Sequence, residues 1–454
     1  MKANNHFIRK SDTVVAAKPF RAADRAWKVF RFAGIWFGAA WGTASFLGVL
    51  AQGPPDSAAV MQRAWADLRT LASETMHGRG YQNDGHSKAA GYIAERFRAA
   101  GLSPAFPGDS LSGYFQTFPI ALNLIEGAAL KINGKALKIG ADYIVHESSG
   151  AGLAAGKAYY AGAGLESDWT KASALDGRVA VITAAVPQGE TRTRLDERCR
   201  SAAMRGAAAV VVLEDKLTAS FSDQTLPIPV VRILKSSVKT KIKKASVSVR
   251  AGYKQLETRN VVGVRRGWRV PDTAVVLSAH YDHLGRVGEA IFYGANDNAS
   301  GTALLLSLAD ALPRTPYSTV FIAFGAEEVG LNGSLYYVSR PAPLPLSKIK
   351  YCLNFDLWGN GEDGVMAVGG KTFTGLFEKI AALNDTLQAT HKLDSRPNAP
   401  NSDHYPFTQK GVPALFFYTL GGPPHYHDVY DRPEGLSLHA FYKFRNLVVH
   451  ALSP

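Results

Sequence analysis

The sequence predicts an α/β protein: a mixed, mostly parallel sheet covered by helices on both faces, with a small β-rich domain inserted into it. From about residue 256, continuous apolar runs such as TAVVLSAH (273–280) and STVFIAF (318–324) alternate with helical segments. Strands that are apolar on both faces are typical of a sheet buried on both sides. Residues 126–254 instead contain short β-branched runs separated by Gly and Ser. The chain of 454 residues is also too long to fold around one hydrophobic core, so more than one folded domain is expected.

The N-terminal elements predict export. Residues 1–31 carry eight Lys or Arg against two Asp, and residues 32–51 (FAGIWFGAAWGTASFLGVLA) contain no charge. A basic region followed by an apolar segment of this length indicates a signal peptide or a membrane anchor, with the following chain outside the cytoplasm. Val49 and Ala51 are small residues at the positions that a signal peptidase reads. Because the basic leader is long for a cleaved signal peptide, the alternative of an uncleaved membrane anchor stays open.

The main domain is expected to begin at residues 57–125. A helix is predicted in which Ser87 is the cap, Ala90, Ile93 and Phe97 lie on one face, and Gly101 ends the helix. The inserted domain follows at 126–254, and it shows no acidic or histidine cluster of its own. Its expected elements are strands at 177–186, 208–215 and 228–233 and a helix at 197–207.

The remaining part, 255–454, is expected to carry the functional site. Its predicted elements are the strands at 273–280, 318–324, 348–357 and 412–418, with an apolar helix at 299–312. In open α/β sheets, functional groups gather at the C-terminal ends of the strands. Metal-capable side chains occur at those positions in this chain: His280 and Asp282, then Asp297, Glu327 and Glu328, Asp356, and finally His425, His427, Asp428 and Asp431.

These side chains predict a zinc centre. Zinc takes imidazole nitrogens and carboxylate oxygens, and two co-catalytic ions need a bridging carboxylate plus terminal ligands. Two histidines and three acids satisfy that requirement: His280, Asp297, Glu328, Asp356 and His427. Asp282 can accept the second N–H of the His280 ring. Glu327 is then free to act as the general base. Singly, each motif fits a solvated surface or a turn; their joint occurrence on successive strand ends favours the metal site.

Composition and motifs exclude other function classes. The net charge of +13 comes largely from residues 1–31 and 235–244, without a basic stripe interleaved with aromatics, so no nucleic-acid partner is expected. The two cysteines, Cys199 and Cys352, form no CxxC motif and indicate no disulfide framework. The chain also lacks the GxSxG, HExxH and GxxxxGK[ST] motifs of other hydrolases and nucleotide-binding proteins.

The metal motifs are specific enough to indicate a family. SAHYDHLG, GANDNASGTA, FGAEEVGLNGS, NFDLWG and YHDVYDRPE resemble, in order, those of the co-catalytic di-zinc aminopeptidases, such as aminopeptidase Y, aminopeptidase S and the glutamate carboxypeptidases. The run SDHYPFTQKGVPALFFY (402–418) is similar to the family's approach to its last histidine. The inserted region resembles a protease-associated domain through LDGRVAVIT and IPVVRI. One departure is Asn296, where an acid often precedes the bridging aspartate.

The resemblance implies a zinc-exopeptidase fold of the phosphorylase/hydrolase-like type and a role for each site residue. Asp297 would bridge two Zn²⁺ ions, His280 and Asp356 would hold one, and Glu328 and His427 the other. Glu327 would be the base. Tyr426 matches a tyrosine that in some members helps to polarise the scissile carbonyl.

The expected function is that of an exported, zinc-dependent exopeptidase, first an aminopeptidase acting on peptide or protein N-termini through activated water. Three alternatives stay open: a carboxypeptidase, a glutaminyl cyclase-like acyltransferase and a non-catalytic, receptor-like relative without metals. The inserted domain disfavours the cyclase. Membrane anchoring through 32–51 also stays open, and the sequence contains no readable code for the preferred N-terminal residue or the oligomeric state.

Overall fold

The structure is a computed structural model that describes residues 56–453 except 109, 170–174 and 186–193. The basic segment 1–31 and the apolar segment 32–51 therefore lie outside the described residues, and the expectations for them remain expectations. Among the described residues, no helix combines the length and apolar character needed to cross a membrane.

The main sheet is mixed and mostly parallel, as predicted. Four parallel strands form its centre in the order β17-β14-β10-β13, and antiparallel β15 and β9 flank them; β16 pairs with β15. The bounds are β9 (Lys244–Arg265), β10 (Val270–His280), β13 (Tyr317–Phe324), β14 (Ile349–Phe355), β15 (Val365–Val368), β16 (Leu393–Arg396) and β17 (Ala414–Thr419). All four apolar runs predicted beyond residue 256 are strands of this parallel centre.

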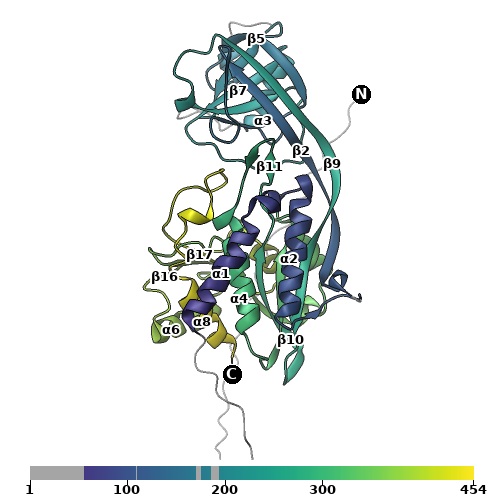
Figure 1. Cartoon of the computed structure of the whole chain (residues 1–454), viewed down its shortest axis with the longest axis vertical. Coiled ribbons are helices and arrows are strands. Elements are labelled where there is room, and N and C mark those ends of the chain that lie inside the picture. The colour runs from purple at the N-terminus through teal and green to yellow at the C-terminus, as the bar shows by residue number, and fades with distance from the viewer. Residues whose placement is uncertain (1–55, 109, 170–174, 186–193, 454) are drawn as a thin grey trace, which may run out of the picture. The chain divides into compact units, whose positions relative to one another are not determined.

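Helices cover both faces of the sheet. Because side chains alternate along a strand, Leu277 and Ala279 of β10 lie in one core while Val276 lies in the opposite one. The first core receives α1 (Ser57–Leu71), α2 (Gly85–Ala99), α4 (Gly301–Ala311), α6 (Thr374–Leu387) and α8 (Phe441–Leu452) (Figure 1). The second receives α5 (Asn332–Ser339) and α7 (His404–Gln409). This layering confirms the predicted fold class.

The first long helix after α1 begins earlier than the sequence predicted. The buried face is as expected, with Ala90, Ile93 and Phe97 fully buried. However, α2 starts at Gly85 and Asp84 occupies the N-cap position, so the prediction that Ser87 caps the helix is wrong. The cause is the preceding turn, in which the carbonyl of Gly80 accepts the backbone N–H of His86 and winds the chain into the helix before Ser87.

The inserted region is joined to the main sheet by two long strands. β2 (Phe115–Ile132) and β9 pair antiparallel along almost their whole lengths and belong to both regions (Figure 1). The expected domain limits, residues 126 and 254, fall inside these strands. The region adds β4 (Tyr143–Val145), β5 (Gly152–Tyr160), β6 (Val179–Thr183), α3 (Leu195–Met204), β7 (Ala209–Glu214) and β8 (Val230–Leu234). Its apolar side chains form two further buried clusters of their own.

Candidate metal centre

The C-terminal ends of the parallel strands bring the predicted side chains together. His280 is the last residue of β10, Asp356 follows β14, and Glu327 and Glu328 follow β13. Asp297 lies in the turn at Ala295–Ser300 that leads into α4, and His427 lies in the loop after β17. All of these residues converge at one edge of the sheet, as expected from its parallel centre.

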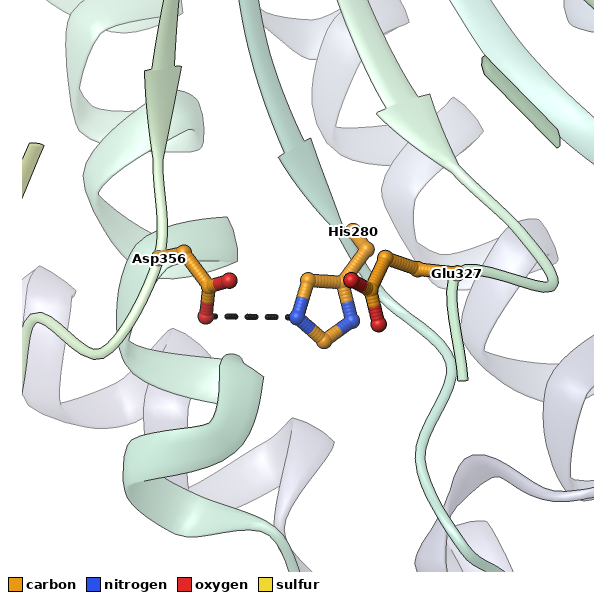
Figure 2. A group of neighbouring side chains, drawn as sticks. All are labelled: His280, Glu327 and Asp356. Carbon is orange, nitrogen blue, oxygen red and sulfur yellow. Dashed lines mark hydrogen bonds and ion pairs between the residues drawn. The ribbon is translucent and has the colours of Figure 1, made fainter. Parts of the chain in front are cut away.

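The first half of the centre is built around His280. Its Nε2 is 3.2 Å from Oδ1 of Asp356 and 3.4 Å from Oδ1 of Asp297. Figure 2 shows the imidazole at the end of its strand, with Asp356 and Glu327 contributed by the strands on either side. One potential ligand atom from each of His280, Glu327 and Asp356 lies within 4.8 Å of the others.

The second half is built around His427. Its Nε2 is 3.0 Å from Oδ2 of Asp297 and 3.1 Å from Oε2 of Glu328. Asp297 therefore faces His280 with one carboxylate oxygen and His427 with the other. This is the geometry of a carboxylate shared between two neighbouring cation positions.

Backbone carbonyls orient both rings. Nδ1 of His427 lies 2.9 Å from the carbonyl oxygen of Ala219, and Nδ1 of His280 lies 3.2 Å from that of Asp282. The expectation that the Asp282 carboxylate accepts the His280 N–H is wrong, because its nearer oxygen is 3.9 Å away. That carboxylate instead accepts the backbone N–H groups of Glu327 and Glu328, at 3.0 and 3.3 Å, and so fixes the turn that carries both glutamates.

The two adjacent glutamates have opposite electrostatic environments. Burial raises the pKa of Glu327 well above its usual value, and neighbouring carboxylates including Asp403 add to the effect. Burial would also raise the pKa of Glu328. The charge of His427 and hydrogen bonds from His283 and His427 outweigh that contribution and hold the pKa of Glu328 at about 2. Opposed pKa values in neighbouring acids favour different chemical roles.

Arg79 organises the turn that carries Asp297, and sequence reasoning missed it. Its fully buried guanidinium donates to the carbonyl oxygens of Tyr281, Gly294 and Asp297, at 2.7, 2.6 and 3.2 Å. Asp431 completes the turn, because its carboxylate accepts the backbone N–H groups of Asn296 and Asp297 at 2.8 and 2.9 Å. Asp431 lies in the last of the metal motifs, whereas no sequence motif singled out Arg79.

A buried polar chain orients Asp356. Ser402 donates to Oδ2 of Asp356 at 2.9 Å, Asn354 donates to Ser402 at 2.9 Å, and Ser278 donates to Asn354 at 2.7 Å. The second carboxylate oxygen is thus occupied, while the first faces His280. Ser278 lies in the SAHYDHLG motif, Asn354 and Asp356 lie in NFDLWG, and Ser402 lies in SDHYPF. Their roles become visible only when β10, β14 and the segment at Ser402 are adjacent.

His283 is a further buried residue that the sequence reasoning assigned no role. Its Nδ1 lies 2.7 Å from Oε1 of Glu328, and it forms a second possible ligand group with Asp297 and Glu328. His427 fits a ligand position better, since its Nε2 lies 3.0 and 3.1 Å from the two carboxylates, whereas the ion pair of His283 is with Glu328. We therefore regard His283 as the residue that orients Glu328 and His427 as the residue that shares a cation with it.

Tyr426 lies beside the centre with half of its side chain exposed. Its ring stacks on that of His427, with 3.8 Å between centroids and 15° between planes. Burial of the hydroxyl and the charges of nearby carboxylates, Asp297 first among them, raise the pKa of Tyr426 well above its usual value, which keeps the phenol protonated. The neighbouring His425 is instead 3.3 Å from Asp428 and is directed into its own loop.

The donor set fits two zinc ions. Ligand atoms on a tetrahedral zinc with bonds of about 2.0–2.1 Å are separated by about 3.3 Å, and the four separations around His280 and His427 are 3.0–3.4 Å. Burial would lower the pKa of both histidines, but adjacent carboxylates raise the pKa of His427 to about 11 and that of His280 well above its usual value. Each ring thus binds a proton that a cation would replace.

Known proteins resemble this chain in sequence and in fold. Residues 260–452 match peptidase family M28. The aminopeptidase YwaD of Bacillus subtilis is 28% identical over 346 residues, which cover 71% of this chain and 72% of YwaD. A glutamate carboxypeptidase 2 homolog of Caenorhabditis elegans is 29% identical over 229 residues, 42% of this chain and 28% of that protein. The crystal structure of BSAP, a zinc aminopeptidase from Bacillus subtilis, superposes with a TM-score of 0.68 at 24% identity, covering 86% of this chain and 94% of BSAP.

The fold and the site define the class of the protein as a metallopeptidase, a hydrolase that uses bound metal to cleave peptide bonds. Within that class, residues 260–452 match peptidase family M28.

Proposed function

We propose that the protein is an exported aminopeptidase that binds two zinc ions per chain and removes N-terminal residues from peptides. The observation that carries the proposal is Asp297, whose two oxygens face His280 and His427 at 3.4 and 3.0 Å. The names of its relatives support it, because YwaD is an aminopeptidase and BSAP a zinc aminopeptidase.

The residues take the following roles in this proposal. His280 and Asp356 would hold one ion, Glu328 and His427 would hold the other, and Asp297 would be shared between them. When bound, the two ions would act as Lewis acids that activate the attacking water and polarise the scissile carbonyl.

Glu327 takes the proton from the attacking water and passes it to the leaving amine. Its buried carboxyl has the raised pKa that suits a group which must both accept and release a proton. The protonated Tyr426 hydroxyl, at the side of His427, is placed to donate to the carbonyl oxygen as negative charge develops there.

A carboxypeptidase is the second candidate, and the match to the glutamate carboxypeptidase homolog supports it. That match covers 42% of this chain. The match to the aminopeptidase YwaD covers 71%, and for this reason the aminopeptidase is the first candidate. Hydrolysis of aminoacyl-anilides supports the first candidate, and hydrolysis of acyl-glutamates without anilide cleavage supports the second. Cyclisation of N-terminal glutamine would identify an acyltransferase.

Two finer expectations belong to the same proposal. Segment 32–51 directs the chain out of the cytoplasm, which N-terminal sequencing of the protein from fractionated cells would test. Residues 126–254 are a protease-associated domain that shapes access to the site. Support for the second comes from the separate buried clusters of this region.

Substitution of Glu327 tests the chemical part of the proposal. Glu327→Gln keeps the size of the side chain but removes its ability to accept a proton. We expect the variant to bind two zinc ions and to lose about 10²–10⁴-fold in kcat, measured with an aminoacyl-anilide alongside elemental analysis. Glu378→Gln, on the surface helix α6, is the control and should retain full activity. Wild-type turnover by the Glu327 variant would contradict the assignment of the base.

A further inference from the structure

A segment of the inserted region contacts a ligand of the proposed metal pair. Residues 216–222, between β7 and β8, pass beside the loop that carries His427. The backbone N–H of Ala219 donates to the carbonyl oxygen of His427 at 3.0 Å, and Nδ1 of His427 lies 2.9 Å from the carbonyl oxygen of Ala219. The ring and the backbone of His427 are therefore both held by one residue that lies 208 positions earlier in the chain.

The second contact sets which nitrogen of the ring is available. A carbonyl oxygen can only accept, so Nδ1 must carry the hydrogen. Nε2 is thereby directed at Asp297 and Glu328. A carbonyl or carboxylate partner on the far nitrogen is the usual way in which a ligating histidine is oriented. Here that partner comes from the inserted region rather than from the sheet that carries the ligands.

Arg232 of β8 holds the 216–222 segment through a hydrogen bond to its backbone. Its Nη1 donates to the carbonyl oxygen of Thr218 at 2.9 Å, directly before Ala219. Nε and Nη2 donate to the two carboxylate oxygens of Glu214, both at 2.9 Å, and Nη1 is also 3.3 Å from Glu147. The Arg232 side chain is 13% exposed and that of Glu214 is 7% exposed. The bidentate pair leaves Arg232 little freedom, so the position of Thr218 is fixed with it.

The two ends of the segment have their own contacts. Nζ of Lys216 donates to the carbonyl oxygen of Pro424, in the His427 loop, at 2.9 Å. The ring of Phe221 packs edge-on against Tyr81 at 5.6 Å, and the hydroxyl of Ser222 bonds to Ser148 at 2.9 Å. The segment has no regular secondary structure. Side-chain contacts and the backbone bonds of Ala219 and Ser222 hold its course, and Arg232 provides the side-chain contact next to Ala219.

We infer that the inserted region is a structural part of the metal centre, with Arg232 acting as a positioning residue that holds His427 in place through Thr218 and Ala219. The inference rests on the proposed function, since it takes His427 as a zinc ligand. The proposed zinc position at His427 thus depends on a contact with Ala219 of the inserted region. At the other position, the His280 ring is oriented by the carbonyl of Asp282, which lies in the main domain.

The test uses zinc affinity in the full chain, because activity alone would not separate positioning from chemistry. Removing Arg232 alone would leave the buried carboxylate of Glu214 unpaired, and that would destabilise the fold for an unrelated reason. The informative variant is therefore Glu214→Gln with Arg232→Met. Glu214→Gln alone is the first control, since it keeps the donor to Thr218. Arg198→Met is the second, because Arg198 is a buried arginine of the same region that donates to Ala163, Thr183 and Ala184.

We expect the double variant to bind one of its two zinc ions about 10–100-fold more weakly, the range seen when the partner of a ligating histidine is lost. Competition against a chelator of known affinity measures this loss. Both controls should bind the two ions with wild-type affinity. In a second arm, Ala219→Pro removes the N–H donated to His427, while Ala219→Gly retains it; only the proline variant should lose affinity for one ion.

Each outcome decides the inference. Two ions bound at wild-type affinity by a folded double variant would overturn it. If the double variant does not fold, the pair of Ala219 variants decides in its place, and equal zinc binding by both would overturn it. A wild-type protein that binds fewer than two ions would overturn the proposed function itself and the inference with it, and that result is distinguishable because it needs no variant.

Discussion

Glu327 and Glu328 show how one residue step separates two chemical environments. Because the chain leaves β13 through a turn at Ala326, with φ of 57°, the two neighbours point to different halves of the site. Glu328 meets His283 and His427, whereas Glu327 faces His280 among other carboxylates. Asp282 accepts both of their backbone N–H groups and keeps the turn in this shape. Repulsion between the two like charges is thus offset by different partners on each side.

A residue away from the metal centre gives a pH prediction. His404 is fully buried, and within the described residues neither ring nitrogen has a partner at hydrogen-bond geometry. Burial lowers the pKa of His404 to about 3. Since the unfolded chain protonates this ring near its ordinary pKa of about 6.5, the stability that neutral His404 contributes is complete above that pH and is lost as the pH falls towards 3. Between pH 7 and pH 5 the loss is about 2 kcal/mol.

Urea unfolding of the metal-free protein at both pH values checks this effect. His404→Leu lacks the titrating group, so its free energy of unfolding should fall less between pH 7 and pH 5, by about 2 kcal/mol. Identical pH dependence in the wild-type protein and this variant would exclude His404 as the cause.

At the scale of elements, the site depends on how α4 begins. The turn at Ala295–Ser300 has to place Asp297 between two histidines while α4 packs against β10 and β14. Asn298 ties the two together, because its side chain donates to the Phe355 carbonyl and accepts the N–H groups of Gly301 and Leu357. The helix and the end of β14 are thus connected through one amide next to the Asp297 carboxylate.

The prediction at the scale of elements concerns a substitution at Gly301. A Cβ at this position would lie 2.3 Å from Oδ1 of Asn298 and 2.5 Å from the carbonyl oxygen of Phe355. We expect Gly301→Ala to cost about 1–3 kcal/mol, the usual range for overpacking, and to weaken zinc binding by displacing Asn298. Thermal unfolding and zinc titration measure the two effects.

Gly91 supplies the matched control, because it lies inside α2 and a Cβ there would meet nothing within 4 Å. Gly91→Ala should stabilise the protein by roughly 0.5–1 kcal/mol. If both alanine variants behaved alike, crowding at Gly301 would not be the reason for its effect.

At the scale of the whole molecule, the sheet concentrates buried negative charge at one edge. Six carboxylates there are almost completely buried: Asp282, Asp297, Glu328, Asp356, Asp403 and Asp431. In the described part of the chain, the histidines among them are His280, His283 and His427, and the buried guanidinium of Arg79 lies at the Asp297 turn. Uncompensated buried charges are costly, so the folded state as a whole should depend on cations at this edge.

Metal removal tests that dependence. We expect dialysis against a chelator to lower the melting temperature and readdition of zinc to restore it. A free zinc concentration 100-fold above the dissociation constant corresponds to about 2.7 kcal/mol of stabilisation. Calorimetry with and without zinc measures the change. An unchanged melting temperature in protein shown to have lost its metal would contradict a stabilising role of the ions.

The sequence by itself determined the elements and the list of candidate ligands. Apolar runs define the strands locally, and the residues that follow each run, such as His280 and Asp356, must meet once those strands are parallel. Local patterns also predicted the buried face of α2. The predicted start of that helix was wrong, because the sequence did not indicate the turn that precedes it.

Only the tertiary structure decided how the candidate ligands are held. Arg79 reaches Asp297 across 218 positions and Ala219 reaches His427 across 208, and no local pattern encodes such distant partners. Asp282 binds backbone N–H groups rather than the histidine beside it, because the turn after β13 passes closer to its carboxylate. Local periodicity specifies which face of an element is buried, whereas hydrogen bonds between distant segments depend on packing that forms only after those faces have met.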